Sequence, residues 1–81
     1  MITSEQIRAA RQLVRITADQ LAKSSGVGVA TIRRVELMVG VPSGNARLVE
    51  AIQRALEDCG VEFIGTPEDC PGVRLIGKKQ Q

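Results

Sequence analysis

The 81-residue sequence contains no histidine, tyrosine or tryptophan, and it has one phenylalanine and two cysteines. Without histidine, a single chain can form neither a Cys/His zinc site nor a Cys-His catalytic pair, and it lacks the usual general base near pH 7. Single-strand and RNA-loop binders stack unpaired bases on aromatic side chains, and this chain has only one aromatic residue, Phe63, for such stacking. We therefore predict no enzymatic activity, no metal site and no cofactor.

Long apolar runs are also missing. No window approaches the roughly 18 consecutive apolar residues of a membrane span, and the start MITSEQIRAAR lacks the apolar segment of a signal peptide. We therefore expect a cytoplasmic protein without a membrane partner. A reducing cytoplasm disfavours a disulfide, so we expect Cys59 in the core and Cys70 as a free thiol in a loop.

The net charge of the chain is small. A hydrophobic fraction of 43%, a charged fraction of 25% and a net charge of +2 are typical of one globular domain. Residues 1–60 contain eight Lys/Arg against six Asp/Glu, whereas residues 61–81 contain three of each. The positive surplus therefore lies in the N-terminal part of the chain, and the position of charge matters more than its total for a nucleic-acid surface.

Capping signals and apolar spacing predict four helices. They are expected at about 4–14, 18–24, 29–37 and 45–59. The pattern T-x-x-Q, typical of a capping box, precedes each of the first two helices, and Gly26 is suited to the left-handed cap that ends the second. In the third helix Ile32 and Val35 point inward, with Val39 as a further candidate, and Ser43 can cap the fourth.

One residue does not fit the apolar face of the first helix. Ile7, Ala10 and Val14 recur at helical spacing, and Arg11 falls on the same stripe. Since an unpaired buried guanidinium is costly, Arg11 must find a carboxylate or leave the interior. Arg8 and Arg15 lie away from this face, and we expect them to be solvated.

The residues after Gly60 change to β-prone runs. We predict short strands at 61–64 and 73–76, separated by the turn-rich GTPEDCPG. The domain organisation is then a helical part, 1–60, with a strand extension, 61–77, and a flexible tail, 78–81. Two strands alone are barely stable in water, so they must pack on the helices, pair with another chain, or both.

The glycines of GVGVAT, residues 26–31, could belong to a phosphate-binding loop or to a turn between helices. A dinucleotide-binding loop needs a preceding strand and a third Gly or Ala, but a helix precedes Gly26 and residue 31 is Thr. The spacing of Ala22, Gly26, Ile32 and Val35 instead matches a helix-turn-helix, which exposes one side of its second helix.

From about Ile7 to Leu56, the sequence resembles the lambda-repressor-like transcriptional regulators, also called the Cro/repressor or xenobiotic-response-element (XRE) helix-turn-helix family. The resemblance is carried by IRAARQL, TADQLA, SGV, TIRRVE and VPS. It implies a mainly α fold, a four- to five-helix lambda-repressor-like DNA-binding domain, here with two short C-terminal β-strands. Members of the family commonly bind palindromic double-stranded DNA as dimers.

The resemblance also implies roles for individual residues. Arg11 would pair with Glu36 in a structural salt bridge, which would provide the carboxylate that a buried Arg11 needs. The base-reading positions would be Val29, Ala30, Arg33 and Arg34. Candidates for the DNA backbone are Thr17, Ala18, Lys23, Gly28, Thr31, Asn45 and Arg47, each of which could instead be a solvated surface residue. Many relatives have Gln in place of Ala18, and Ser or Thr in place of Gly28, so a polar side chain is lost at both positions.

Two functions follow as hypotheses. The first is a sequence-specific transcriptional regulator of bacterial or phage type, associated with the nucleoid, that binds an inverted repeat as a homodimer and has no evident small-molecule ligand. Its candidate dimer contacts are Phe63, Ile64, Leu75 and Ile76, which could equally pack within the chain. The alternative is a protein-interaction or antitoxin-like module on the same scaffold.

Overall fold

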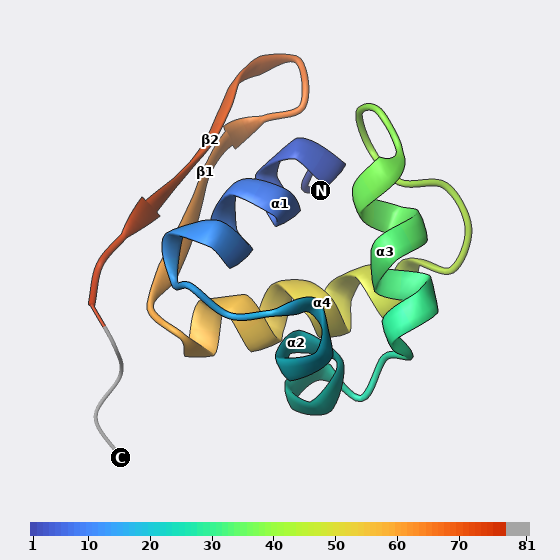
Figure 1. Cartoon of the computed structure of the whole chain (residues 1–81). Coiled ribbons are helices and arrows are strands. Elements are labelled where there is room, and N and C mark those ends of the chain that lie inside the picture. Colours follow the sequence, from blue (N-terminus) through green and yellow to red (C-terminus); the bar gives the residue numbers. More distant parts are fainter. Residues whose placement is uncertain (78–81) are drawn as a thin grey trace.

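The computed structural model describes residues 1–77 as four helices followed by a β-hairpin (Figure 1). The elements are α1 (Ser4–Leu13), α2 (Ala18–Ser25), α3 (Val29–Leu37), α4 (Ala46–Asp58), β1 (Val61–Thr66) and β2 (Asp69–Leu75). All four predicted helices are present, with ends that agree to within one residue. The predicted tail, 78–81, lies outside the described residues. No helix in the described part of the chain is long and apolar enough to cross a membrane.

Both predicted capping boxes are formed. The Thr3 hydroxyl oxygen accepts a hydrogen bond from Gln6 N at 3.0 Å, and Gln6 Oε1 accepts one from Thr3 N at 2.8 Å. Thr17 and Gln20 make the same reciprocal pair at 3.0 and 2.8 Å. Gly26 ends α2 with φ 76°, the left-handed conformation expected of it. The first two helices are therefore started by local sequence signals.

The last two helices begin differently. Gly28 is the N-cap of α3 and provides no side-chain hydrogen bond, as predicted from its lack of a side chain. The prediction that Ser43 caps α4 is wrong. The chain turns once more at Gly44, with φ 109°, and the Asn45 side chain accepts from Arg47 N at 2.9 Å. The fourth helix consequently begins at Ala46.

A single apolar core joins the helices to the hairpin. Its largest fully buried side chains are those of Ile7, Leu21, Ile32, Ile52, Leu56 and Val61. Val39 was predicted to point inward but is 88% exposed. The helical spacing used for that prediction no longer applies there, because α3 ends at Leu37 and Met38 has extended backbone angles.

The hairpin is antiparallel, and its ladder starts with Val61 opposite Leu75. The strands were predicted at 61–64 and 73–76. In the structure β1 continues to Thr66 and β2 begins at Asp69, so both extend further towards the turn, and Ile76 lies just beyond the end of β2. Pairing continues towards the turn because the backbone accommodates an irregularity between Ile64 and Thr66.

The irregularity lies between Ile64 and Thr66, where Gly65 has φ 77° and Cys70 on the opposite strand has φ 53°. These left-handed residues let the ladder resume after the irregularity. Cys70 is therefore an exposed residue of β2 rather than of a loop, which corrects the prediction. Cys59 is half-buried at the C-cap of α4, whereas we predicted it in the core.

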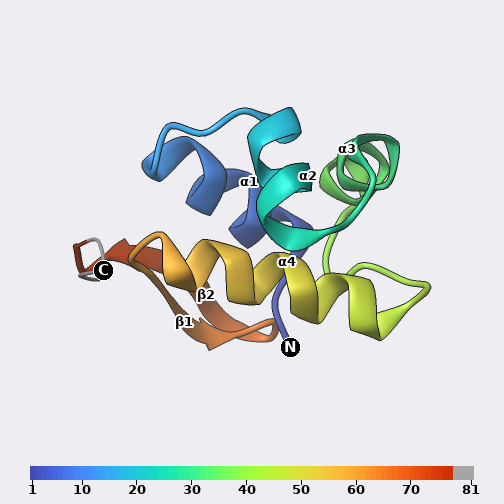
Figure 2. The same ribbon diagram turned by 90° about the horizontal axis from the view of Figure 1, so that it is seen from below.

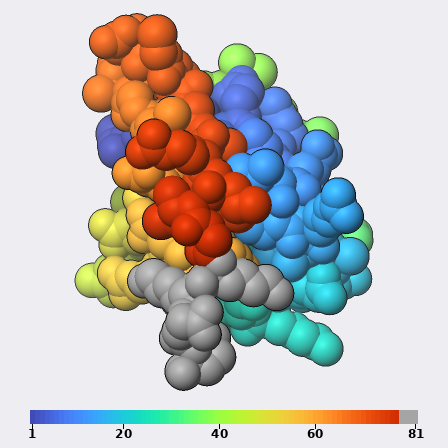
Figure 3. All heavy atoms as spheres, turned by 90° about the vertical axis from the view of Figure 1, so that its left-hand side faces the viewer, coloured from blue at the N-terminus to red at the C-terminus, as the bar shows by residue number. Residues whose placement is uncertain are grey.

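The hairpin forms an outer layer over α1 and α4. Figure 3 shows it lying between these two helices on one face of the molecule, and Figure 2 shows it from below. Gln6 anchors it, since its Nε2 donates to Ile64 O at 3.1 Å and to Gly72 O at 2.8 Å. Helix α3 lies on the opposite side of α1 from the hairpin (Figure 1).

Candidate nucleic-acid interface

Helices α2 and α3 lie crosswise and are joined by a short, well-anchored turn. Each is seen nearly end-on in the view that shows the other from the side (Figures 1 and 2). Within the turn, Val27 is buried in the core. The Ser25 hydroxyl accepts from Val27 N at 3.2 Å and donates to Leu21 O at 2.7 Å. The relative position of the two helices is therefore fixed by apolar packing together with a hydrogen-bonded turn.

The outward side of α3 is a continuous exposed stripe. Its members follow the spacing i, i+3, i+4 and i+7, and they are Ala30, Arg33, Arg34 and Leu37. On the opposite side Ile32, Val35 and Glu36 are buried. Neither Arg33 nor Arg34 has a hydrogen-bond or ion-pair partner within residues 1–77. Two guanidinium groups are thus available to a ligand on one face of a short helix.

The predicted base-reading residues do not all lie on this stripe. Ala30, Arg33 and Arg34 are exposed, whereas Val29 is half-buried in the first turn of α3. The stripe contains one residue that sequence reasoning did not assign, Leu37, which is 83% exposed. The signal for it was present, since Leu37 lies seven residues after Ala30.

Most of the predicted backbone-contact residues lie at helix N-termini. Six of the seven belong to the N-caps and first turns of α2, α3 and α4, namely Thr17, Ala18, Gly28, Thr31, Asn45 and Arg47. Ala18 and Thr31 are half-buried, and the other four are exposed. The seventh, Lys23, is exposed in the last turn of α2. Free backbone N–H groups and the positive end of the helix dipole favour anions at such positions.

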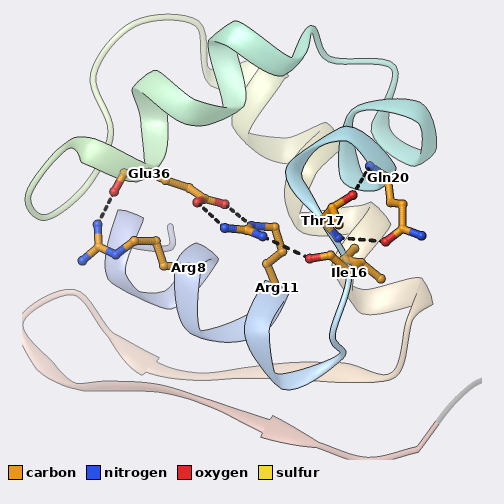
Figure 4. Close-up of polar contacts among 6 residues, drawn as sticks. All are labelled: Arg8, Arg11, Ile16, Thr17, Gln20 and Glu36. Carbon is orange, nitrogen blue, oxygen red and sulfur yellow. Dashed lines mark hydrogen bonds and ion pairs between the residues drawn. The ribbon is translucent and has the colours of Figure 1, made fainter.

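The capping boxes add a donor that sequence reasoning missed. The Gln20 side chain uses its oxygen to accept from Thr17 N, so its amide nitrogen points away from the helix start (Figure 4). Gln20 is exposed. The capping pattern itself contained the signal, because Gln in place of Glu removes a negative charge and supplies two N–H donors.

The end of α3 is held by α1. Arg11 Nε donates to Glu36 Oε2 at 2.7 Å and Arg11 Nη2 donates to Glu36 Oε1 at 3.0 Å, which confirms the predicted salt bridge (Figure 4). Arg11 Nη1 also donates to Ile16 O at 3.1 Å. The bond to the Glu36 carboxylate raises the pKa of Arg11 above its ordinary value. The only charged side chain on the apolar stripe of α1 is thus paired.

Three more residues of α1, Arg8, Glu5 and Ser4, contact the same region. Arg8 Nη1 donates to the backbone oxygen of Glu36, so the prediction that Arg8 is merely solvated is wrong (Figure 4). Carbonyls in the last turn of a helix lack intrahelical partners, and a guanidinium can satisfy them. The Glu5 carboxylate accepts from Gly40 N at 3.1 and 3.3 Å, and Gly40 O accepts from Ser4 N at 2.8 Å. Hydrogen bonds from its own backbone N–H and from Gly40 lower the pKa of Glu5.

The candidate dimer residues of the hairpin fall into two groups. Phe63 is half-buried and packs against the core, so it is largely used within the chain. Ile64, Leu75 and Ile76 are 37%, 51% and 62% exposed.

Residues 1–77 contain no group of three or more Cys, Asp or Glu side chains placed to hold a metal ion. Among known proteins, no family model and no curated protein matches this chain.

Proposed function

We propose that this chain is a sequence-specific, double-stranded DNA-binding transcriptional regulator of the lambda-repressor-like type, with α2, the turn and α3 as its helix-turn-helix. The observation that carries the proposal is the exposed stripe of α3, in which Arg33 and Arg34 have no partner among the described residues. The crosswise packing of α2 and the contacts from α1 support it, because a reading helix must be held in one orientation.

In the proposed complex α3 enters the major groove, which is about 12 Å wide and admits a helix. Arg33 and Arg34 supply most of the sequence reading, since an arginine can donate two hydrogen bonds to guanine. Ala30 contacts a thymine methyl group. The N-termini of α2 and α4 face phosphates, with Thr17, Asn45 and Arg47 as backbone contacts.

Regulators of this type act as homodimers, and we propose the same for this chain, in the cytoplasm of a bacterium or of a phage host. Two α3 helices about 34 Å apart would read the half-sites of an inverted repeat, one turn of B-DNA from each other.

A second candidate function is a protein-interaction or antitoxin-like module on the same scaffold. It is favoured by the tip of α3, where Gly28, Val29 and Ala30 provide no side-chain hydrogen-bonding group. The salt dependence of binding separates the two functions, because log affinity falls steeply with log salt only when phosphates are contacted.

The proposal is tested with Arg33→Ala and Arg34→Ala, and with Arg54→Ala as a matched control. Arg54 is an exposed arginine of α4, so its loss changes the net charge equally but leaves α3 intact. Binding to duplex DNA is measured by fluorescence anisotropy. Each α3 variant should lose about 1–3 kcal/mol of binding free energy and discriminate less between sequences. Equal binding by all three variants would contradict the assignment.

A further inference from the structure

Leu37, in the last turn of α3, is an apolar side chain on the exposed stripe that carries Arg33 and Arg34. It is 83% exposed and lies outside the apolar core formed by the described residues. It follows Arg33 by four residues and Arg34 by three, so the three side chains are neighbours on one side of the helix. Because its surface stays in water, Leu37 contributes little to folding. That surface is available to whatever α3 binds.

The end of α3 that carries Leu37 is held in place from both sides. The preceding residue, Glu36, is bound through its carboxylate by Arg11 and through its backbone oxygen by Arg8 (Figure 4). Beyond the helix, Gly40 exchanges hydrogen bonds with the first turn of α1. Helix ends commonly fray, but this one is fixed at both flanks. Leu37 therefore has a defined position, which specific recognition requires.

The surroundings of Leu37 indicate the chemistry of the ligand. The only charged residues of α3 are Arg33, Arg34 and Glu36, and Glu36 is buried and paired. The exposed stripe therefore has two positive charges and no negative one, with Ala30 at one end and Leu37 at the other. Duplex DNA matches this combination, because its phosphates are anionic and the C5-methyl group of thymine is an apolar group exposed in the major groove.

The spacing along α3 also matches the spacing of base pairs. A helix rises by about 1.5 Å per residue, so Leu37 lies about 10 Å from Ala30 along the axis and about 5–6 Å from the two arginines. Base pairs of B-DNA are about 3.4 Å apart, so the stripe spans about three base-pair steps. With α3 in the groove, its two apolar ends reach different base pairs from those reached by the arginines between them.

We propose that Leu37 is a specificity-determining residue that contacts the C5-methyl group of a thymine, about one to two base pairs from the guanine read by Arg33 or Arg34. The inference rests on the proposed function, because it requires α3 to lie in the major groove. It adds a feature of the DNA to that function. Each half-site has thymine methyl groups at both ends of the stripe, about three base pairs apart, with the guanine contact between them.

The test replaces single thymines of the bound sequence by deoxyuridine, which lacks only the C5-methyl group. The bound sequence comes from selection among random duplexes, and affinities are measured by fluorescence anisotropy for the unaltered chain and for Leu37→Ala. The matched control is Val39→Ala, which shortens an apolar side chain that is 88% exposed but lies beyond the end of α3. Circular dichroism verifies that each variant is folded.

For the unaltered chain, we expect deoxyuridine at the position contacted by Leu37 to weaken binding about fourfold, the effect of exposing one methyl group. Leu37→Ala should bind the thymine sequence more weakly and lose the distinction between thymine and deoxyuridine at that position. It should keep the distinction at the position contacted by Ala30. Val39→Ala should behave like the unaltered chain at both positions.

The inference alone is overturned if Leu37→Ala distinguishes thymine from deoxyuridine as the unaltered chain does, or if the selected half-site has no thymine at that place. It is also overturned if Val39→Ala loses the same distinction. If the unaltered chain selects no sequence at all, the proposed function fails and this inference fails with it. The two failures are therefore distinguishable.

Discussion

Replacing Arg11 by alanine should destabilise the fold, because it leaves the Glu36 carboxylate without its partner. The Glu36 side chain is 9% exposed and that of Arg11 is 21% exposed. Removing one member of a buried ion pair costs about 3–5 kcal/mol, and the partial exposure of Arg11 places this case near 3 kcal/mol. Arg8 does not compensate, since it contacts only the backbone oxygen of Glu36.

That loss is large for a chain of this size. A total stability of roughly 0.05–0.15 kcal/mol per residue corresponds to about 4–12 kcal/mol here. The melting temperature of a small domain falls by about 4–8 °C per kcal/mol, so we expect a decrease of about 12–24 °C. Urea unfolding gives the free energy directly. It must be followed by circular dichroism, because the chain has no tryptophan or tyrosine.

A double-mutant cycle separates the ion pair from the packing of its carbon atoms. We expect Arg11→Met combined with Glu36→Leu to be less destabilised than the sum of the two single changes, because neither charge is then left unpaired. A loss below about 1 kcal/mol for Arg11→Ala, or strictly additive effects in the cycle, would show that the Arg11–Glu36 ion pair contributes little to stability.

Three further predictions concern the same scaffold. Gln6→Glu keeps the capping acceptor but loses both hydrogen bonds that Gln6 donates to the hairpin, so the free energy of unfolding should fall by about 1–3 kcal/mol in the urea assay. Gln20→Glu is the control: Gln20 caps a helix in the same way but donates no bond to the hairpin, so its replacement should be near neutral. Glu5 has a pKa lowered from 4.5, so its carboxylate stabilises the fold above that pH and the contribution is lost as the pH falls through the folded pKa. The stability difference between the unaltered chain and Glu5→Gln should therefore shrink in acid, and a pH-independent difference would argue against the contact. Gly65→Ala would place its Cβ against the backbone oxygen of Cys70 across the turn at a positive φ, and it should cost about 2–5 kcal/mol in thermal melts.

The parts of the fold that depend on residues close together in the sequence could be predicted from the sequence. The capping boxes and the left-handed Gly26 are local, so four helices were located to within one residue at each end. Periodicity indicated that Arg11 must find a carboxylate or leave the interior, but only the resemblance indicated Glu36. The resemblance indicated Ala30, Arg33 and Arg34 on the exposed side of α3, but it did not indicate Leu37, which helical spacing places on the same side.

What could not be predicted depends on contacts between distant segments. Arg8 looks like a surface residue in the sequence, and its partner is a backbone oxygen 28 residues away. The amide of Gln6 reaches carbonyls 58 and 66 residues away, and no local pattern encodes those bonds. Val39 was misplaced because a helical period was extended past the end of its helix.

The proposal that α3 reads double-stranded DNA is tested by selecting bound sequences from a pool of random duplexes with the unaltered chain. We expect recovery of one inverted repeat whose half-sites are about one helical turn apart, bound with a steep dependence on salt. We also expect Arg33→Ala and Arg34→Ala to change the recovered sequence. Recovery of no common sequence by a folded, dimeric chain would contradict the claim and favour the protein-interaction module.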